Sequence, residues 1–211
     1  MTTISMLANA SKCASMQTPI PAWDLLLRGV VAGVLTFHVL HLALPGPLRP
    51  VRLALIAFAL SLLAYLLCQQ ADLMSLLPPT LAWCALGLCT SGTLWLWLAS
   101  RALFDDRFAW QPSLLALAAG MVALGFSAHS HHLPGLTAIA GKEASSQWVR
   151  LHQLAQLVFI AATVWEVTRG WRDDLVAPRR IARRWVAMAI AAYAAVVLVV
   201  EVAIEGQPAG P

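Results

Sequence analysis

The chain has 211 residues, of which 60% are hydrophobic and 11% charged, with a formal net charge of +4. Soluble domains contain about 25% charged residues, so this composition excludes an ordinary soluble protein and predicts a membrane protein. Repeated runs of about 20 apolar residues lack the period-two alternation of a membrane β-barrel. They predict an all-α fold, a polytopic membrane helix bundle with about six transmembrane helices.

The apolar runs divide the chain into three parts. Residues 1–21 are rich in Ser, Thr and Pro and are expected to form a flexible N-terminal tail. Residues 22–204 are expected to form one six-helix transmembrane bundle, and residues 205–211 a C-terminal tail. The expected helices cover residues 22–44, 51–68, 81–103, 112–128, 148–169 and 185–204. Neither an inverted repeat nor a broken helix pair is evident.

Basic residues gather in every second loop. The loop after the first expected helix carries Arg49 and Arg52, and the loop after the third carries Arg101 and Arg107. The loop after the fifth carries Arg169, Arg172, Arg179, Arg180, Arg183 and Arg184. The loop after the second has no basic residue, and the loop after the fourth has Lys142 and Arg150 over a longer span. The positive-inside rule therefore places the odd-numbered loops in the cytoplasm and the N-terminus outside.

Ionisable side chains within the apolar runs are candidates for signal sensing, because an unpaired charge is costly in a bilayer. Arg28, His152 and Glu201 are expected near the outer side. Glu201 has no basic neighbour in its own helix, so its partner is expected from another helix, with Arg28, Arg150 or His152 as candidates, unless the carboxylate stays hydrated at the interface. Asp24 lies four residues before Arg28, which leaves a local ion pair open.

A second polar group is expected nearer the inner side. His38 and His41 share one helical face, and Glu166 lies at a similar depth. Transmembrane histidines can ligate haem or a metal ion. A b-type haem usually needs two histidines on facing helices, so hydrogen bonds to a neighbouring helix or headgroup are the favoured interpretation. The histidine-rich connection at residues 129–132 is read as a solvated loop, with metal or pH sensing as the alternative.

Other reactive residue types give no motif. The four cysteines, Cys13, Cys68, Cys84 and Cys89, lack CxxC spacing, and three of them lie in or beside apolar runs, where they are expected to act as small hydrophobic residues. The segment Ser91-Gly92-Thr93 is expected to mark close helix packing. No hydrolase or transferase motif is present, so neither an enzyme activity nor a cofactor is expected.

Two segments carry a resemblance to a known family. Residues 94–106 (LWLWLASRALFDD) and 170–180 (GWRDDLVAPRR) resemble parts of the membrane-embedded N-terminal region of some AraC-type bacterial transcription regulators, and their order, separation and flanking hydropathy also fit. The resemblance implies a membrane sensor or anchor domain, with the helix-turn-helix DNA-binding part absent from this chain. Six helices that begin outside also end outside, so a cytoplasmic DNA-binding domain would require a seventh helix. The chain is expected to be part of such a longer regulator, or a short relative that lacks the DNA-binding domain.

The cytoplasmic loops supply the candidates for coupling. Ion pairs between the loop after the third expected helix and the loop after the fifth would join these two helices. The candidate coupling residues are Asp105, Asp106, Arg172, Asp173, Asp174, Arg179 and Arg180.

The arginines of the last loop are expected to contact anionic lipid headgroups, or to dock a cytoplasmic domain. The expected partners are the lipid bilayer and those headgroups, with a homodimer left open and no nucleic acid contacted by this chain itself. The alternative functions are a small multi-pass transporter or channel and, less favoured, a haem- or metal-binding membrane protein.

Overall fold

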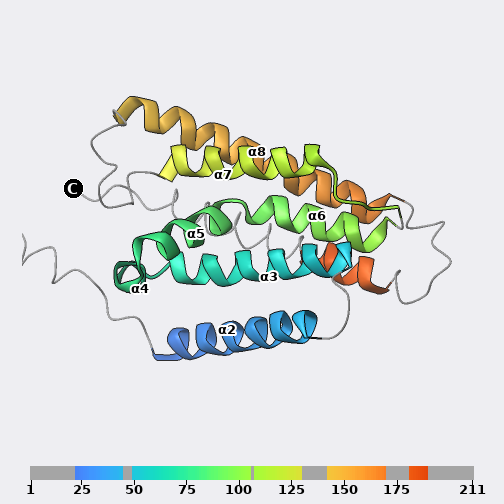
Figure 1. The fold of residues 1–211 in the computed structure, drawn as a ribbon, viewed down its shortest axis with the longest axis horizontal. Helices are drawn as coiled ribbons and strands as arrows, with labels where there is room; N and C mark the ends of the chain where they lie inside the picture. The colour runs from blue at the N-terminus through green and yellow to red at the C-terminus, as the bar shows by residue number, and fades with distance from the viewer. Residues whose placement is uncertain (1–21, 45–48, 106, 130–141, 170–180, 190–211) are drawn as a thin grey trace, which may run out of the picture.

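The computed structural model describes residues 22–44, 49–105, 107–129, 142–169 and 181–189. All regular secondary structure in these residues is helical, which confirms the all-α prediction (Figure 1). The helices are α2 (Ala22–Ala43), α3 (Pro50–Cys68), α4 (Ala71–Leu76), α5 (Pro79–Thr90), α6 (Gly92–Phe104), α7 (Pro112–His129) and α8 (Lys142–Thr168). Residues 181–189 are also helical.

Proline fixes where three of these helices begin. Pro50, Pro79 and Pro112 are the first residues of α3, α5 and α7. The first N–H groups of a helix have no partner within it, so proline loses nothing there, and its fixed φ angle suits the first turn. The starts of these helices therefore lie within two residues of the expected positions.

Helix α6 occupies the centre of the bundle. One face of α6 packs on α7 in an apolar cluster of Leu94, Leu98, Leu114, Ala118 and Met121, with Ala155 and Phe159 of α8 packed against it. Another face packs on α3 through Ala54, Ala99 and Ala102. Alanines let two helix backbones approach closely, which is how helices associate when lipid offers no hydrophobic gain between them.

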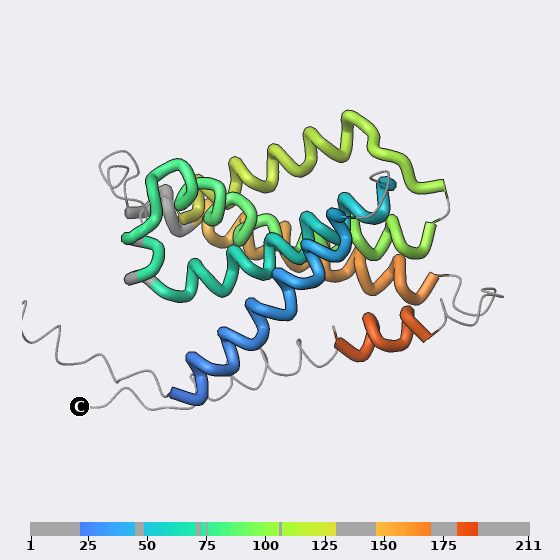
Figure 2. The backbone as a smooth tube through the Cα atoms, turned by 60° about the horizontal axis from the view of Figure 1, so that its bottom comes forward, coloured from blue at the N-terminus to red at the C-terminus, as the bar shows by residue number. Residues whose placement is uncertain are grey.

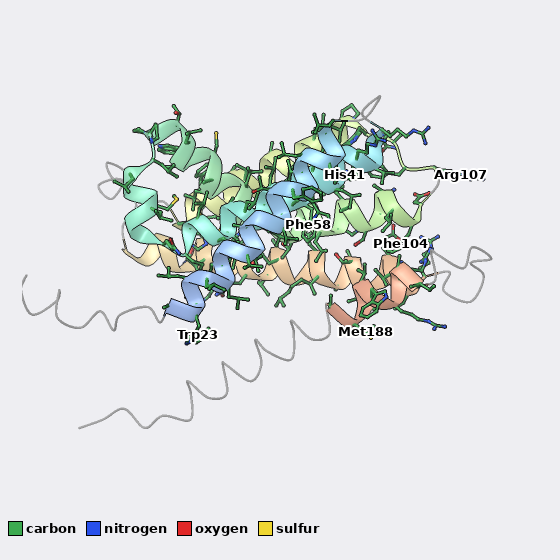
Figure 3. All side chains as sticks on the ribbon, turned by 90° about the horizontal axis from the view of Figure 1, so that it is seen from below. Trp23, His41, Phe58, Phe104, Arg107 and Met188 are labelled. Atoms are coloured by element: carbon green, nitrogen blue, oxygen red, sulfur yellow. The ribbon has the colours of Figure 1, made fainter. Side chains whose placement is uncertain are left out.

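Helix α2 lies at the edge of the bundle and crosses α3 (Figure 2). None of its residues is buried, and large apolar side chains such as Trp23 and Phe37 are 69% and 66% exposed. Figure 3 shows Trp23 and His41 at opposite ends of this helix. An apolar surface of this extent suits contact with lipid rather than water.

Three of the described helices, α2, α3 and α7, are long and apolar enough to cross a membrane, and a fourth span results if α5 and α6 are counted as one bent span. Six spans are expected from the sequence. Helix α8 is not among these candidates. Its first part is polar, with Lys142, Glu143 and Arg150, and its later, more apolar part still holds His152, two glutamines and Glu166. Of the sixth expected helix, only residues up to 189 lie within the described part of the chain.

The structure corrects two expectations about continuity. The third expected helix, residues 81–103, is divided into α5 and α6, which are bent by 61° relative to each other. A broken helix pair is therefore present, where one unbroken helix is expected from the sequence. The expected loop at residues 69–79 contains the short helix α4.

Candidate functional site

The helix break, defined here as Thr90, Ser91 and Gly92, separates α5 from α6 (Figure 1). The hydroxyl of Thr90 donates to the carbonyl of Leu86 at 2.9 Å, and that of Ser91 donates to the carbonyl of Gly87 at 2.6 Å. Such hydroxyls compete with the backbone N–H groups and bend helices. Gly92 follows directly, and Ser-Gly pairs are a common position for a sharp bend.

His152 of α8 binds the backbone at this break. Its Nε2 atom lies 2.9 Å from the carbonyl oxygen of Thr90, and the imidazole is 2% exposed. A carbonyl only accepts, so Nε2 carries the hydrogen. The last carbonyls of a helix have no partner within it, and an unsatisfied one is costly away from water. His152 therefore supplies the donor that the end of α5 requires.

Further polar side chains surround the histidine. The amide nitrogen of Gln156 lies 3.4 Å from the same Nε2 atom. Two donors do not bond each other, so exchanging the amide oxygen and nitrogen of Gln156 gives the better arrangement. The ring of His129, the last residue of α7, meets that of His152 edge to face with centroids 5.3 Å apart. On the other side of the break, the indole N–H of Trp95 donates to the Ser91 hydroxyl at 3.0 Å.

Two glycines bring α7 against the break. A Cβ atom on Gly125 of α7 would overlap the Oγ1 and Cβ atoms of Thr90. A Cβ on Gly87 of α5 would lie 3.2 Å from Val122 of α7. In contrast, nothing lies within 4 Å of a Cβ built on Gly120, five residues earlier in α7. Gly125 is therefore the position where contact with the break leaves no space for a side chain.

A second polar group, here called the arginine junction and defined by Arg101, Glu166 and Arg183, lies at the other end of α8. Nη1 of Arg183 donates to the carbonyls of Arg169, Glu166 and Val167 at 2.7, 3.1 and 3.2 Å. Its guanidinium also lies 4.5 Å from the ring centroid of Phe104, the last residue of α6. A buried cation thus meets the negative end of the α8 dipole and its terminal carbonyls.

The side chain of Glu166 faces α6 at this junction. Its Oε1 atom is 3.8 Å from Nε of Arg101, which also lies 3.9 Å from a carboxylate oxygen of Asp105. The guanidinium of Arg101 lies 5.6 Å from the ring centroid of Trp97. These contacts are longer than hydrogen bonds, so their contribution is electrostatic and screened where the groups meet solvent.

Three of the candidate polar residues, Arg28, His38 and His41, have contacts within their own helix. Arg28 pairs with Asp24 at 2.8 Å, the local ion pair that the sequence left open. His38 donates from Nδ1 to the carbonyl of Val34 in its own helix at 2.8 Å, and the ring of His41 stacks on Phe37. Glu166 approaches Arg101 of α6. The link between the third and fifth expected helices thus involves Arg101 and Glu166.

Several candidates lie outside the described residues. These are Glu201, Asp106, Arg172, Asp173, Asp174, Arg179 and Arg180. Asp105 is described, and its side chain accepts a hydrogen bond from the backbone N–H of Arg107 at 2.9 Å. Within the described ranges, no group of three or more His, Cys, Asp or Glu side chains is arranged to hold a metal ion.

Sequence reasoning missed Thr90, Gly125 and Arg183. The Ser91-Gly92 pair is a local signal for a bend as well as for close helix packing. The contacts of Gly125 and Arg183 come from other helices and have no local signal. No protein-family description, curated protein or solved structure matches the chain.

Proposed function

We propose that the chain is a membrane-embedded sensor or anchor domain of the kind found in membrane-bound AraC-type transcription regulators, with the DNA-binding part outside this chain. One observation supports signal transmission in particular. Helix α8 contacts the helix break through His152 and belongs to the arginine junction through Glu166 and its last carbonyls. One continuous helix thus connects two polar groups that hold the two ends of α6.

In this mechanism the bend between α5 and α6 is the element with two arrangements. His152 and Glu166 are about 21 Å apart along α8, at a rise of about 1.5 Å per residue. An outer signal that opens the bond between His152 and Thr90 would change the bend, and α6 would move Arg101 and Phe104 at the arginine junction. A coupling claim of this kind requires an element whose equilibrium both sites shift.

The proposal includes a topology of six spans in a bacterial inner membrane, with the N-terminus outside. It also includes lipid contact by the arginines near residues 179–184, which are worth on the order of 1 kcal/mol each near an anionic surface. Fusions to alkaline phosphatase, which is active only outside, and to a fluorescent protein that matures inside the cell would test this. We expect phosphatase activity after residues 70, 136 and 211 and fluorescence after 107 and 176. Phosphatase activity after residue 176 would contradict the topology.

The sensor function has its own test. The chain would replace the membrane region of a full-length membrane-bound AraC-type regulator, with a seventh helix added, and a reporter promoter would be measured. We expect His152→Ala to change reporter output several-fold at equal protein level, and Gly120→Ala to leave it unchanged. If output follows protein level alone in every variant, the chain acts as an anchor and does not transmit a signal.

A transporter or channel is the second candidate, and the bent pair α5 and α6 favours it. Transporters bind substrates at broken helices whose freed backbone groups face the ligand. Here the described hydroxyls at the break bond to Leu86 and Gly87, and the Thr90 carbonyl bonds to His152. These groups are therefore used within the protein, which favours the sensor. Solute flux into liposomes that contain the purified chain, abolished by His152→Ala, would support the transporter instead.

A further inference from the structure

Two cysteines that lie 21 positions apart in the sequence meet beside the helix break. The thiols of Cys68 and Cys89 lie close enough to interact with each other. Cys68 is the last residue of α3, and Cys89 lies in α5, two residues before Ser91. Both side chains are partly exposed, and α3 packs against α5. Without CxxC spacing, only the fold brings these two sulfur atoms together.

We propose that Cys68 and Cys89 are a redox-active pair that closes to an intramolecular disulfide by exchange with a thiol–disulfide oxidoreductase of the outer compartment. The loop that follows Cys68, residues 69–78, contains no Arg or Lys. The positive-inside rule assigns such a loop to the outer side, where disulfides form and persist. The inference rests on that assignment and not on the sensor function.

The electron balance of the exchange is simple. The thiolate of Cys68 attacks one sulfur of the oxidoreductase disulfide, forms a mixed disulfide and releases the second oxidoreductase sulfur as a thiolate. The thiolate of Cys89 then attacks the Cys68 sulfur and expels the first. Two thiols of this chain are oxidised, one disulfide of the partner is reduced, and the two protons pass to the partner's thiolates. Cys68 is the first nucleophile because it lies at the end of its helix, beside the polar Gln69 and Gln70.

Other roles for the pair fit less well. A structural zinc site takes four ligands, and no third His, Cys, Asp or Glu joins a metal-binding group within the described residues. A disulfide here would join α3 to the segment of α5 that directly precedes the bend, so oxidation would restrict movement at the helix break.

The experiment uses the purified full chain in lipid nanodiscs, fully reduced and then equilibrated with glutathione buffers from reducing to oxidising. Reactive thiols are counted by a maleimide-polymer gel shift after denaturation, and the linked peptide is identified by mass spectrometry. Cys84 is the matched control because it lies on α5 and is exposed. We expect two of the four thiols in wild type and two of the three thiols in Cys84→Ser to become protected, and the 68–89 linkage to be lost in Cys68→Ser and in Cys89→Ser.

The partner is tested with a purified CxxC oxidoreductase in its oxidised form. It should close the pair at least about ten-fold faster than glutathione disulfide at equal concentration, because a preformed disulfide with a good leaving thiolate exchanges faster. The Cys89→Ser variant, which retains Cys68, should accumulate a mixed disulfide with this enzyme. If all four thiols of the wild-type chain stay reactive in the most oxidising buffer, or if the linkage includes Cys84, the proposal that Cys68 and Cys89 form a redox-active pair is wrong. Equal rates with both oxidants would overturn the assignment of the partner.

Discussion

Replacing Gly125 with alanine tests whether the contact between α7 and the helix break has the geometry described here. The new methyl group would overlap Thr90, so either α7 moves away or Thr90 turns and loses its hydrogen bond to Leu86. Overpacking of this kind costs about 1–3 kcal/mol, and a lost hydrogen bond about 0.5–1.5 kcal/mol. The better helix propensity of alanine offsets at most about 1 kcal/mol. We expect a net destabilisation of about 1–3 kcal/mol.

Gly120→Ala is the matched control for this change. It places the same methyl group on the same helix, where nothing lies within 4 Å, so its free energy of unfolding should stay unchanged or rise by up to about 1 kcal/mol. Titration with dodecyl sulfate in mixed micelles, followed by tryptophan fluorescence, measures both variants. Thr90→Ala should recover part of the Gly125→Ala loss because it removes Oγ1, the atom nearest to the new methyl group, while the Cβ atom of residue 90 remains. Equal stability of the two glycine variants would refute the close contact.

Three further substitutions test the polar contacts by the same unfolding measurement. His152→Ala leaves the last carbonyl of α5 without its donor and should cost about 1–3 kcal/mol, so a loss below 0.5 kcal/mol, on the order of measurement error, would exclude the bond. Arg183→Lys should cost about 1–2 kcal/mol because a compact ammonium cannot reproduce the guanidinium contacts, whereas Arg184→Lys, on the exposed side of the same helical segment, should be neutral. Glu166→Gln should cost less than about 1 kcal/mol because its pair with Arg101 is partly exposed, and this small loss should shrink further in high salt.

Local features of the fold could be predicted from the sequence because their causes are local. The apolar runs located α2, α3 and α7 to within two residues, since Pro50 and Pro112 fix the starts of two of them. The ion pair between Asp24 and Arg28 follows from their four-residue spacing on one helix. In each case the residues that interact lie within about one helical turn.

The central contacts could not be predicted because they join positions far apart in the chain. His152 binds a carbonyl 62 residues away. Arg183 binds carbonyls 14–17 residues away, and the sequence between them has no hydrophobic periodicity from which this contact could be predicted. The expected depth of His152 in the bilayer made it one candidate partner for Glu201, which lies outside the described residues. In the described structure the imidazole bonds a backbone carbonyl instead. A broken helix creates such backbone acceptors, which cannot be found by considering side chains alone.

The arrangement of α6 and α8 makes a further prediction about coupling. Helix α6 begins at the break that His152 holds and ends at Phe104, against which Arg183 packs. If α6 moves as a rigid helix of about 18 Å, losing either contact should weaken the other. A double-mutant cycle of His152→Ala and Arg183→Lys should then give an interaction energy above about 0.5 kcal/mol, although sites this far apart are usually additive to within about 0.3–0.5 kcal/mol. The pair His38→Ala and Arg183→Lys is the control, since His38 bonds only within α2 in the described contacts and should be additive. Additivity in both cycles would mean that the break and the arginine junction act independently, and α6 and α8 would then be a scaffold without a role in transmission.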